Sequence, residues 1–278
     1  MTAAAPASSR RPPKPRPSIW VPIGIVAFLA LTWASLSREF GIGFDLFKVL
    51  GDLTRGAPIL SDTSRPVAQQ GLLHPNWAFL PRTVGPMLET FQMAVLASAI
   101  GCAIALPVAF LASRVTAPNL PTYIADRGIL SVVRAIPDIL YALVFVAAVG
   151  IGVLPGIMAL ILFNIGVVAK LLSETVDGVD TGPIEASRAG GANRTQTVRW
   201  AVLPQVLPNY VAYSLYTFEL NIRASTVIGI VGAGGIGYLL SGQYRFFNWS
   251  NVSVIIIELF VFVFFIELVS IWLRRRLV

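Results

Sequence analysis

The stretch DILYALVFVAAVGIGVLPGIMALILFNIGVVAK, residues 138–170, contains 31 consecutive uncharged residues between Asp138 and Lys170. Because about 20 apolar residues already cross the hydrocarbon of a membrane as a helix, this run is too long for one upright helix. Residues that favour turns lie near its middle, namely Gly150, Gly152, Pro155 and Gly156. The run therefore predicts two membrane-spanning helices joined by a tight hairpin, at about 129–150 and 154–172.

The composition extends this prediction to the rest of the chain. Of the 278 residues, 55% are hydrophobic and only 13% are charged, and the mean hydropathy is +0.73. A soluble domain has about 25% charged residues. Further apolar runs of spanning length lie at about 18–37, 88–112, 206–231 and 252–273, and the run at 206–231 is the least hydrophobic of them. We predict an all-α polytopic membrane protein with about six transmembrane helices.

The segments around these runs suggest a domain order. Residues 1–17 contain four basic residues, five prolines and no acid, which predicts a disordered tail. Residues 18–37 are expected to be a retained first transmembrane helix, because the run is long for the apolar part of a cleaved signal peptide, which is the alternative. Residues 38–82 then form an outer connecting segment, and residues 83–278 form a core with five transmembrane helices.

The distribution of basic residues predicts the topology. If the N-terminus is cytoplasmic, 13 of the 21 Lys and Arg residues fall in inner segments. Basic residues accumulate in the short cytoplasmic loops of membrane proteins. We therefore expect both termini to be cytoplasmic.

Several classes of function are poorly supported by the residues present. The net charge of +7 does not come from one continuous basic patch, so nucleic acid is not an expected partner. One cysteine, Cys102, and one histidine, His74, are too few for a disulfide framework or a multi-ligand zinc site. None of the three lysines follows a glycine, as the phosphate-binding lysine of a Walker motif would. We expect no catalytic residue, cofactor or metal in this chain, and a membrane enzyme and a passive channel remain alternatives of other classes.

The stretch GAGGIG, residues 232–237, has the glycine spacing of a dinucleotide-binding turn. Such a turn needs several further strands to complete a sheet, but only about 40 residues follow Gly237. Glu258, at the place of a ribose-binding acid, is followed by an apolar run that continues to about residue 273. We therefore interpret the glycines as a close-packed break at the outer end of the fifth span.

The segment SETVDGVDTGPIEASRAGGANRTQTVRWAVLPQ, residues 173–205, separates the fourth and fifth spans on the predicted inner side. Pro183 suits the first turn of a helix, and Glu185 lies where the helix dipole favours an acid. Gly190 and Gly191 supply a stop. The pattern predicts a short helix, a break and a second helix.

Glu185-Ala186-Ser187, Gly191 and Leu203-Pro204 in this segment resemble the cytoplasmic EAA loop of ABC importer permeases. Ser187 and Ala201 depart from the residues that are commonest in that family. The resemblance implies a type I ABC importer permease fold, in which the loop inserts as a coupling helix into a cleft of a separate ATPase subunit. The residues that it implies for this contact are Glu185, Ala186, Ser187, Gly190 and Gly191.

The stretches RAIPDILYALVFV and NIRAST, within residues 76–237, look like the PhnE-type permeases of phosphonate uptake systems. The resemblance implies transport of phosphonate or a related phosphorus oxyanion across the bacterial inner membrane. It also implies four partners: a second copy of the chain, a cytoplasmic ATPase dimer that binds ATP and Mg, an extracytoplasmic phosphonate-binding protein and membrane lipid. An ABC permease for an amino acid or another oxyanion is the alternative.

Charged residues within spans usually face a bundle interior, a partner or a wet cavity. Two opposite charges four residues apart share one helical face, which predicts the ion pairs Arg134–Asp138 and Glu219–Arg223. The second pair lies mid-span in a segment of polar residues that we interpret as the wall of the translocation path, comprising Glu219, Asn221, Arg223, Ser225 and Thr226. Since a guanidinium recognises phosphorus oxyanions well, Arg223 is expected to attract the anion while Glu219 holds its side chain. A purely structural pair is the alternative, and Glu258 and Glu267 have no obvious partner in sequence.

Overall fold

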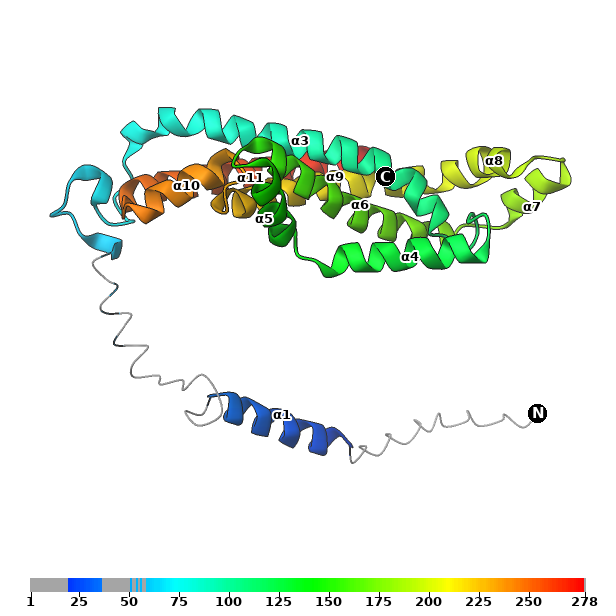
Figure 1. Ribbon diagram of the computed structural model, residues 1–278, viewed down its shortest axis with the longest axis horizontal. Coiled ribbons are helices and arrows are strands. Elements are labelled where there is room, and N and C mark those ends of the chain that lie inside the picture. Colours follow the sequence, from blue (N-terminus) through cyan, green and yellow to red (C-terminus); the bar gives the residue numbers. More distant parts are fainter. Residues whose placement is uncertain (1–19, 37–50, 52–53, 55, 57–58, 278) are drawn as a thin grey trace, which may run out of the picture. The chain divides into compact units, whose positions relative to one another are not determined.

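Figure 1 presents a computed structural model, which describes residues 20–36, 51, 54, 56 and 59–277. The chain divides into two compact units, Met1–Ala57 and Pro58–Val278. Helices are the only regular elements of the described residues, as predicted for an all-α protein. The predicted tail, residues 1–17, lies outside the described residues.

The first unit contributes one described helix, α1 (Trp20–Leu36), of 17 residues. A helix of this length measures about 26 Å, slightly less than the roughly 30 Å of hydrocarbon that a spanning helix crosses. Large apolar side chains such as Trp20, Phe28 and Trp33 are exposed on it. This helix occupies the predicted first span, residues 18–37, and its apolar surface suits lipid.

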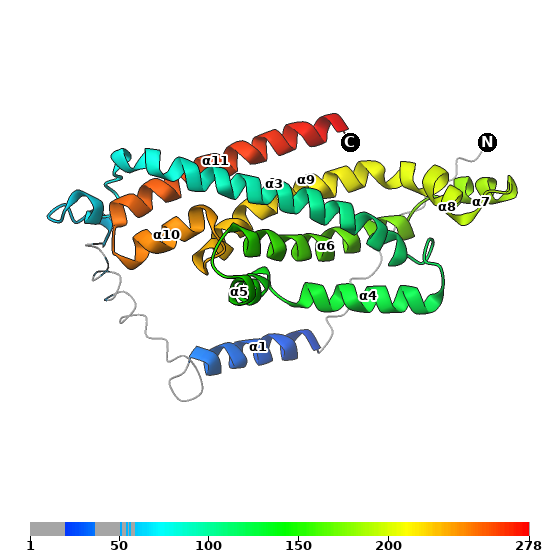
Figure 2. The same cartoon turned by 45° about the horizontal axis from the view of Figure 1, so that its top comes forward.

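Four long apolar helices of the second unit have the length and composition to cross a membrane. They are α3 (Leu80–Leu111), α6 (Val153–Asp177), α9 (Leu203–Ile230) and α11 (Trp249–Leu277). Figure 2 shows α6 and α9 running lengthwise through this unit, while α3 and α11 cross each other obliquely. Small residues allow close packing between these helices: a Cβ atom on Gly101 of α3 would lie 2.6 Å from Asn164 Cβ of α6.

The predicted single helix over 129–150 is wrong. The chain instead forms α4 (Leu120–Ala135) and α5 (Asp138–Val149), whose axes are bent by 85°. The cause is Pro137, which lacks an amide hydrogen and disfavours helical dihedral angles at the residue before it. Ile136 is extended accordingly, with φ −92° and ψ 121°. The described residues thus contain four spanning helices, or five if α4 and α5 form one broken span.

The predicted glycine break lies between α9 and α10 (Gly235–Arg245). Gly232 and Gly234 have φ angles of 100° and 80°, which glycine adopts readily and other residues rarely do. A Cβ atom on Gly237 would lie 2.0 Å from the carbonyl oxygen of Thr226. The first turn of α10 therefore packs directly against the last turns of α9, and no strand precedes the glycines.

Shorter elements complete the second unit. Two 3₁₀ turns, Val67–Gln69 and Trp77–Phe79, precede α3. Between α6 and α9 lie α7 (Gly182–Ala189), α8 (Arg194–Thr197) and a π-helical turn, Val198–Val202. In both views α7 and α8 lie at one end of the bundle, and α10 lies toward the other (Figures 1 and 2).

Candidate functional site

Helix α7 carries the residues predicted to contact an ATPase subunit. Pro183 lies in its first turn, and Glu185 is its N-terminal acid. After the helix, Gly191 adopts a φ of 82° in open space, so that the chain turns away where the glycine stop was predicted. The predicted short helix and break are therefore present.

The face that α7 presents to its surroundings is made of small and polar residues. Glu185, Ala186, Gly190 and Gly191 are exposed, whereas Ser187 is half-buried with its Oγ atom 3.4 Å from Thr197 Oγ1. Arg188 of α7 is also exposed, whereas the short side chains at Ala186, Gly190 and Gly191 permit close approach of another backbone beside it. This geometry is suited to docking of a partner protein.

A single apolar side chain anchors α7 to the rest of the protein. Ile184 is only 3% exposed and packs into a core with Leu172, Val202 and Val206. After the break, Asn193 Oδ1 accepts a hydrogen bond from Gln196 N at 2.9 Å, and Asn193 N donates to Gln196 Oε1 at 2.8 Å. This capping box starts the second helix of the prediction at a fixed place.

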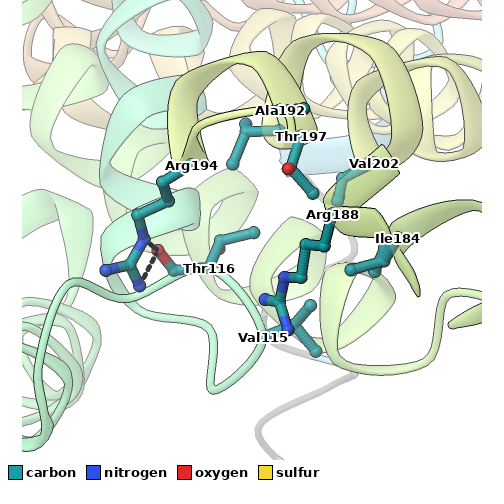
Figure 3. A pocket seen from close by; sticks show the side chains of 9 residues that line it. Val115, Thr116, Ile184, Arg188, Ala192, Arg194, Thr197 and Val202 are labelled. Carbon is teal, nitrogen blue, oxygen red and sulfur yellow. Dashed lines mark hydrogen bonds between the residues drawn. The ribbon is translucent and has the colours of Figure 1, made fainter. Parts of the chain in front are cut away.

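Arg194 connects this loop to the segment between α3 and α4, residues 112–119, which we call the α3–α4 connection. Its guanidinium donates to the carbonyl oxygens of Thr116, Ala117 and Pro118. Figure 3 shows Arg194 reaching Thr116 beside a cavity of about 310 Å³, with Arg188 on the other side of that cavity. Sequence reasoning missed this role of Arg194, because its acceptors lie 76 to 78 residues away.

Asp177, the last residue of α6, makes a second connection to the same segment. Its Oδ1 atom accepts hydrogen bonds from Ser113 Oγ and Arg114 N, both at 2.7 Å. Its Oδ2 atom lies 3.6 Å from Arg127 Nη2 of α4. A hydrogen bond from Arg114 to the Tyr123 hydroxyl raises the pKa of the guanidinium.

Glu219 lies at the centre of a charge network between α9 and α11. It forms the predicted ion pair with Arg223, and its other oxygen lies 2.9 Å from Arg274 Nη2. Arg274 also donates to Ser270 Oγ at 2.9 Å, and Arg223 lies 3.8 Å from Glu267. Glu267 thus has a partner that the sequence did not reveal.

Glu219 and Arg223 lie well inside α9 (Leu203–Ile230), and Glu267, the second acid near Arg223, lies well inside α11. Arg274 belongs to the last turn of α11, beyond the predicted span of 252–273. Its contact with Glu219 joins the interior of α9 to the last turn of α11. Only 11% of the Glu219 side chain is exposed, whereas 49% of the Arg223 side chain is. Arg223 therefore presents a charged group on the surface of this subunit.

The other residues of the predicted path lie differently. Asn221 and Ser225 are fully buried, and Thr226 is half-buried. Asn221 Nδ2 donates to Ser98 Oγ of α3 at 2.7 Å, and Ser225 Oγ donates to the carbonyl oxygen of Ile222. In this structure Asn221 and Ser225 belong to the packing within one subunit, and Arg223 alone of the five is exposed.

The geometry assumed for the pair Arg134–Asp138 is wrong. Arg134 lies in the last turn of α4 and Asp138 in the first turn of α5, so the 85° bend removes their common helical face. No salt bridge joins them among the described residues, although both line a cavity of about 300 Å³. Asp138 Oδ1 instead accepts a hydrogen bond from Ile139 N at 2.9 Å.

Comparison with known proteins identifies the family. Residues 105–278 match the family described as "Binding-protein-dependent transport system inner membrane component". The chain is 45% identical over 190 residues to the phosphate-import permease protein PhnE of Mycolicibacterium smegmatis. The matched region is 68% of this chain but only 36% of that protein. It is 39% identical over 202 residues to the phosphite transport system permease protein PtxC of Stutzerimonas stutzeri. This matched region is 73% of this chain and 74% of that protein.

A solved structure agrees with the fold. An inward-facing structure of the MetNI methionine ABC transporter matches 73% of this chain and 99% of the compared chain, with a TM-score of 0.63 and 26% sequence identity. The chain spans only about a third of the length of the Mycolicibacterium relative. The family match, the relatives and the helical fold agree with one another: this chain is a multi-pass membrane protein that belongs to the binding-protein-dependent ABC importer permeases.

Proposed function

We propose that this chain forms the translocation pathway of an ATP-driven importer for phosphonate or a related phosphorus oxyanion. The observation that carries the proposal is the identity of 45% and 39% to permeases named for phosphate and phosphite. A permease named for D-methionine, from Vibrio cholerae, is only 27% identical. The gap in identity favours a phosphorus oxyanion over an amino acid.

The transporter contains two copies of this chain, a cytoplasmic ATPase dimer that binds ATP and Mg, and an extracytoplasmic binding protein. This assembly would lie in the bacterial inner membrane with both termini of the chain in the cytoplasm. The C-terminal basic residues Arg274, Arg275 and Arg276 support this orientation, because the end of α11 points toward the same end of the bundle as α7 (Figure 2). Basic residues at that end agree with the positive-inside rule.

Helix α7 serves as the coupling helix. The exposed small residues Ala186 in the helix and Gly190 and Gly191 just after it let a cleft of the ATPase approach the backbone, and Glu185 offers a charge at the rim. Closure of the ATPase dimer on ATP would then draw the two α7 helices together, and this motion opens the spanning helices outward. Release of nucleotide returns the path to the inward-facing state.

Arg223 attracts the anion on its way through the membrane. Its exposed guanidinium is oriented by Glu219 and lies 3.8 Å from Glu267. The carboxylates of Glu219 and Glu267 balance the charges of Arg223 and Arg274. An oxyanion therefore binds the Arg223 guanidinium only weakly and can leave it again. Asn221 and Ser225, being buried, act on the path only by holding α9 in place.

Uptake measurements test the substrate. Cells that lack their own phosphonate, phosphite and phosphate importers would receive this chain with its ATPase and binding protein, and labelled methylphosphonate, phosphite, phosphate and methionine would be offered in turn. We expect ATP-dependent uptake of a phosphorus oxyanion and none of methionine. Uptake of methionine alone would overturn the proposal.

A further inference from the structure

Residues 178–202, which contain α7, are connected to the α3–α4 connection on both sides of that helix, by Asp177 immediately before the segment and by Arg194 within it. We call residues 178–202 the coupling segment. Immediately before it, Asp177 accepts hydrogen bonds from Ser113 Oγ and Arg114 N at 2.7 Å. These contacts join the C-terminal end of α6 to the chain that has just left α3.

Toward the other end, Arg194 binds three consecutive carbonyl oxygens of the same connection. Its Nε and Nη2 atoms donate to the Thr116 oxygen at 3.2 and 2.9 Å, and Nη1 donates to the Pro118 oxygen at 3.0 Å. Nη2 also reaches the Ala117 oxygen. Because a guanidinium is planar and presents several donors in a fixed fork, this contact fixes orientation as well as distance.

The α3–α4 connection is itself closely braced. Ser113 and Thr116 are buried, and Thr116 Oγ1 donates to the Phe110 oxygen at 2.6 Å. Val115 N donates to Ser113 Oγ at 3.1 Å, and Ala117 N donates to the Ser113 oxygen at 2.9 Å. A connection with these internal bonds has little slack, so a displacement at one point moves the whole of it.

We propose that the α3–α4 connection is a second transmission element of the transporter, with Arg194 as its positioning residue. Covalent continuity alone passes a displacement of the coupling segment only to α6 and α9, the helices on either side of it. The contacts of Asp177 and Arg194 pass the same displacement to α3 and α4, so four helices respond together. This inference rests on the proposed coupling role of α7, and a cavity of about 310 Å³ lies between Arg188 and Arg194 where the connection faces α7 and α8.

Uptake per ATP hydrolysed is the first test, measured in proteoliposomes that contain the complete transporter. We expect Arg194→Gln to lower this ratio roughly tenfold while assembly and ATP hydrolysis persist, because charge-assisted hydrogen bonds are lost. Arg194→Lys, which keeps the charge and can reach one or two carbonyls, should recover part of the ratio. Arg199→Gln is the matched control: it removes a charge from the same segment, and Arg199 is an exposed residue whose guanidinium lies over the Trp200 ring.

A distance measurement tests the same proposal without any cargo. Spin labels would be attached at Leu120→Cys and Thr195→Cys, both exposed positions outside the residues proposed to contact the ATPase, while the native Cys102 is buried. We expect the separation of the two labels within one subunit to stay constant between the nucleotide-free and the vanadate-trapped complex, and to change between those states in Arg194→Gln.

The outcomes separate this inference from the proposed function. Failure of the parent protein to import any phosphorus oxyanion contradicts the proposed substrate, whereas the label distances still report on the transmission element. A normal ratio of uptake to ATP in Arg194→Gln overturns the inference. If Arg194→Gln does not assemble, the parent alone decides: a separation that changes with nucleotide overturns the inference, and a constant one supports it.

Discussion

Glu219 of α9 and Arg274 of α11 form an ion pair of 2.9 Å across 55 residues of sequence. The carboxylate is nearly buried and also pairs with Arg223, so that one acid joins two cations. The pair links the helix that carries the exposed Arg223 to the last turn of the chain's C-terminal helix. The stability of the bundle at this end should therefore depend on Arg274.

Arg274→Gln is expected to destabilise the protein by about 1–3 kcal/mol, because the buried Glu219 loses a charged donor. The thermal unfolding midpoint of the purified protein in detergent measures the effect. Arg275→Gln is the matched control, since Arg275 is the exposed neighbour in the same helical turn. Equal midpoints for the two variants would contradict a stabilising role for the pair.

The two acids near Arg223 should differ in importance. Glu219→Gln is expected to cost about 1.5–3 kcal/mol, because its carboxylate is buried and pairs with two arginines. Glu267→Gln should cost less than about 0.5 kcal/mol, because its side chain is 47% exposed and lies 3.8 Å from Arg223. Unfolding measurements of both variants under one condition check the order, and a larger effect for Glu267 would reverse it.

The parts of the structure that could be predicted from sequence are those set by residues close together in the chain. Helices α3, α6, α9 and α11 correspond to predicted spans, because a spanning helix needs a local run of apolar residues. The helix–break–helix pattern of the loop is also local, since Pro183, Glu185 and Gly191 lie within nine residues of one another. Both predictions rest on neighbours in the chain.

The features that the prediction missed are set by packing. Hydropathy averaged over a window treated residues 129–150 as one apolar run, although Pro137 lies inside it and causes the 85° bend. The second partner of Glu219, Arg274, belongs to a basic triplet, residues 274–276, that looks like an ordinary membrane-flanking cluster. Likewise, nothing in the spacing of the sequence indicates that Arg194 reaches the carbonyl oxygens of residues 116–118. Only the tertiary structure brings these groups together.

Gly237→Ala should disrupt the packing of α10 on α9. The added Cβ atom would lie 2.0 Å from the carbonyl oxygen of Thr226, a backbone atom that cannot rotate away. Overpacking of this kind costs about 1–3 kcal/mol or more, so we expect less folded protein in the membrane and a lower unfolding midpoint. Gly242→Ala, in the same helix but with nothing within 4 Å of the added atom, is expected to have no harmful effect. Similar losses for both variants would show that the contact with the Thr226 carbonyl oxygen is not the cause.

Ile184→Ala should weaken docking of the ATPase more than it weakens the fold. Ile184 is the buried residue of α7, so its truncation removes the apolar contact that holds α7 against the core. Truncating a buried isoleucine costs about 2–5 kcal/mol, but the loss here falls on a short peripheral helix. We expect the unfolding midpoint of the spanning bundle to change little.

Copurification of the ATPase subunit with the tagged permease measures the docking. The yield of complex should fall several-fold for Ile184→Ala, while Ile184→Val, which removes one methylene and keeps most of the contact, should retain most of it. The exposed surface of α7 is the same in all three proteins, because the substitution lies on its buried side. A full yield of complex with Ile184→Ala would mean that α7 docks without being held in place by the core, and a fall equal to that of the unfolding midpoint would assign the effect to folding rather than to docking.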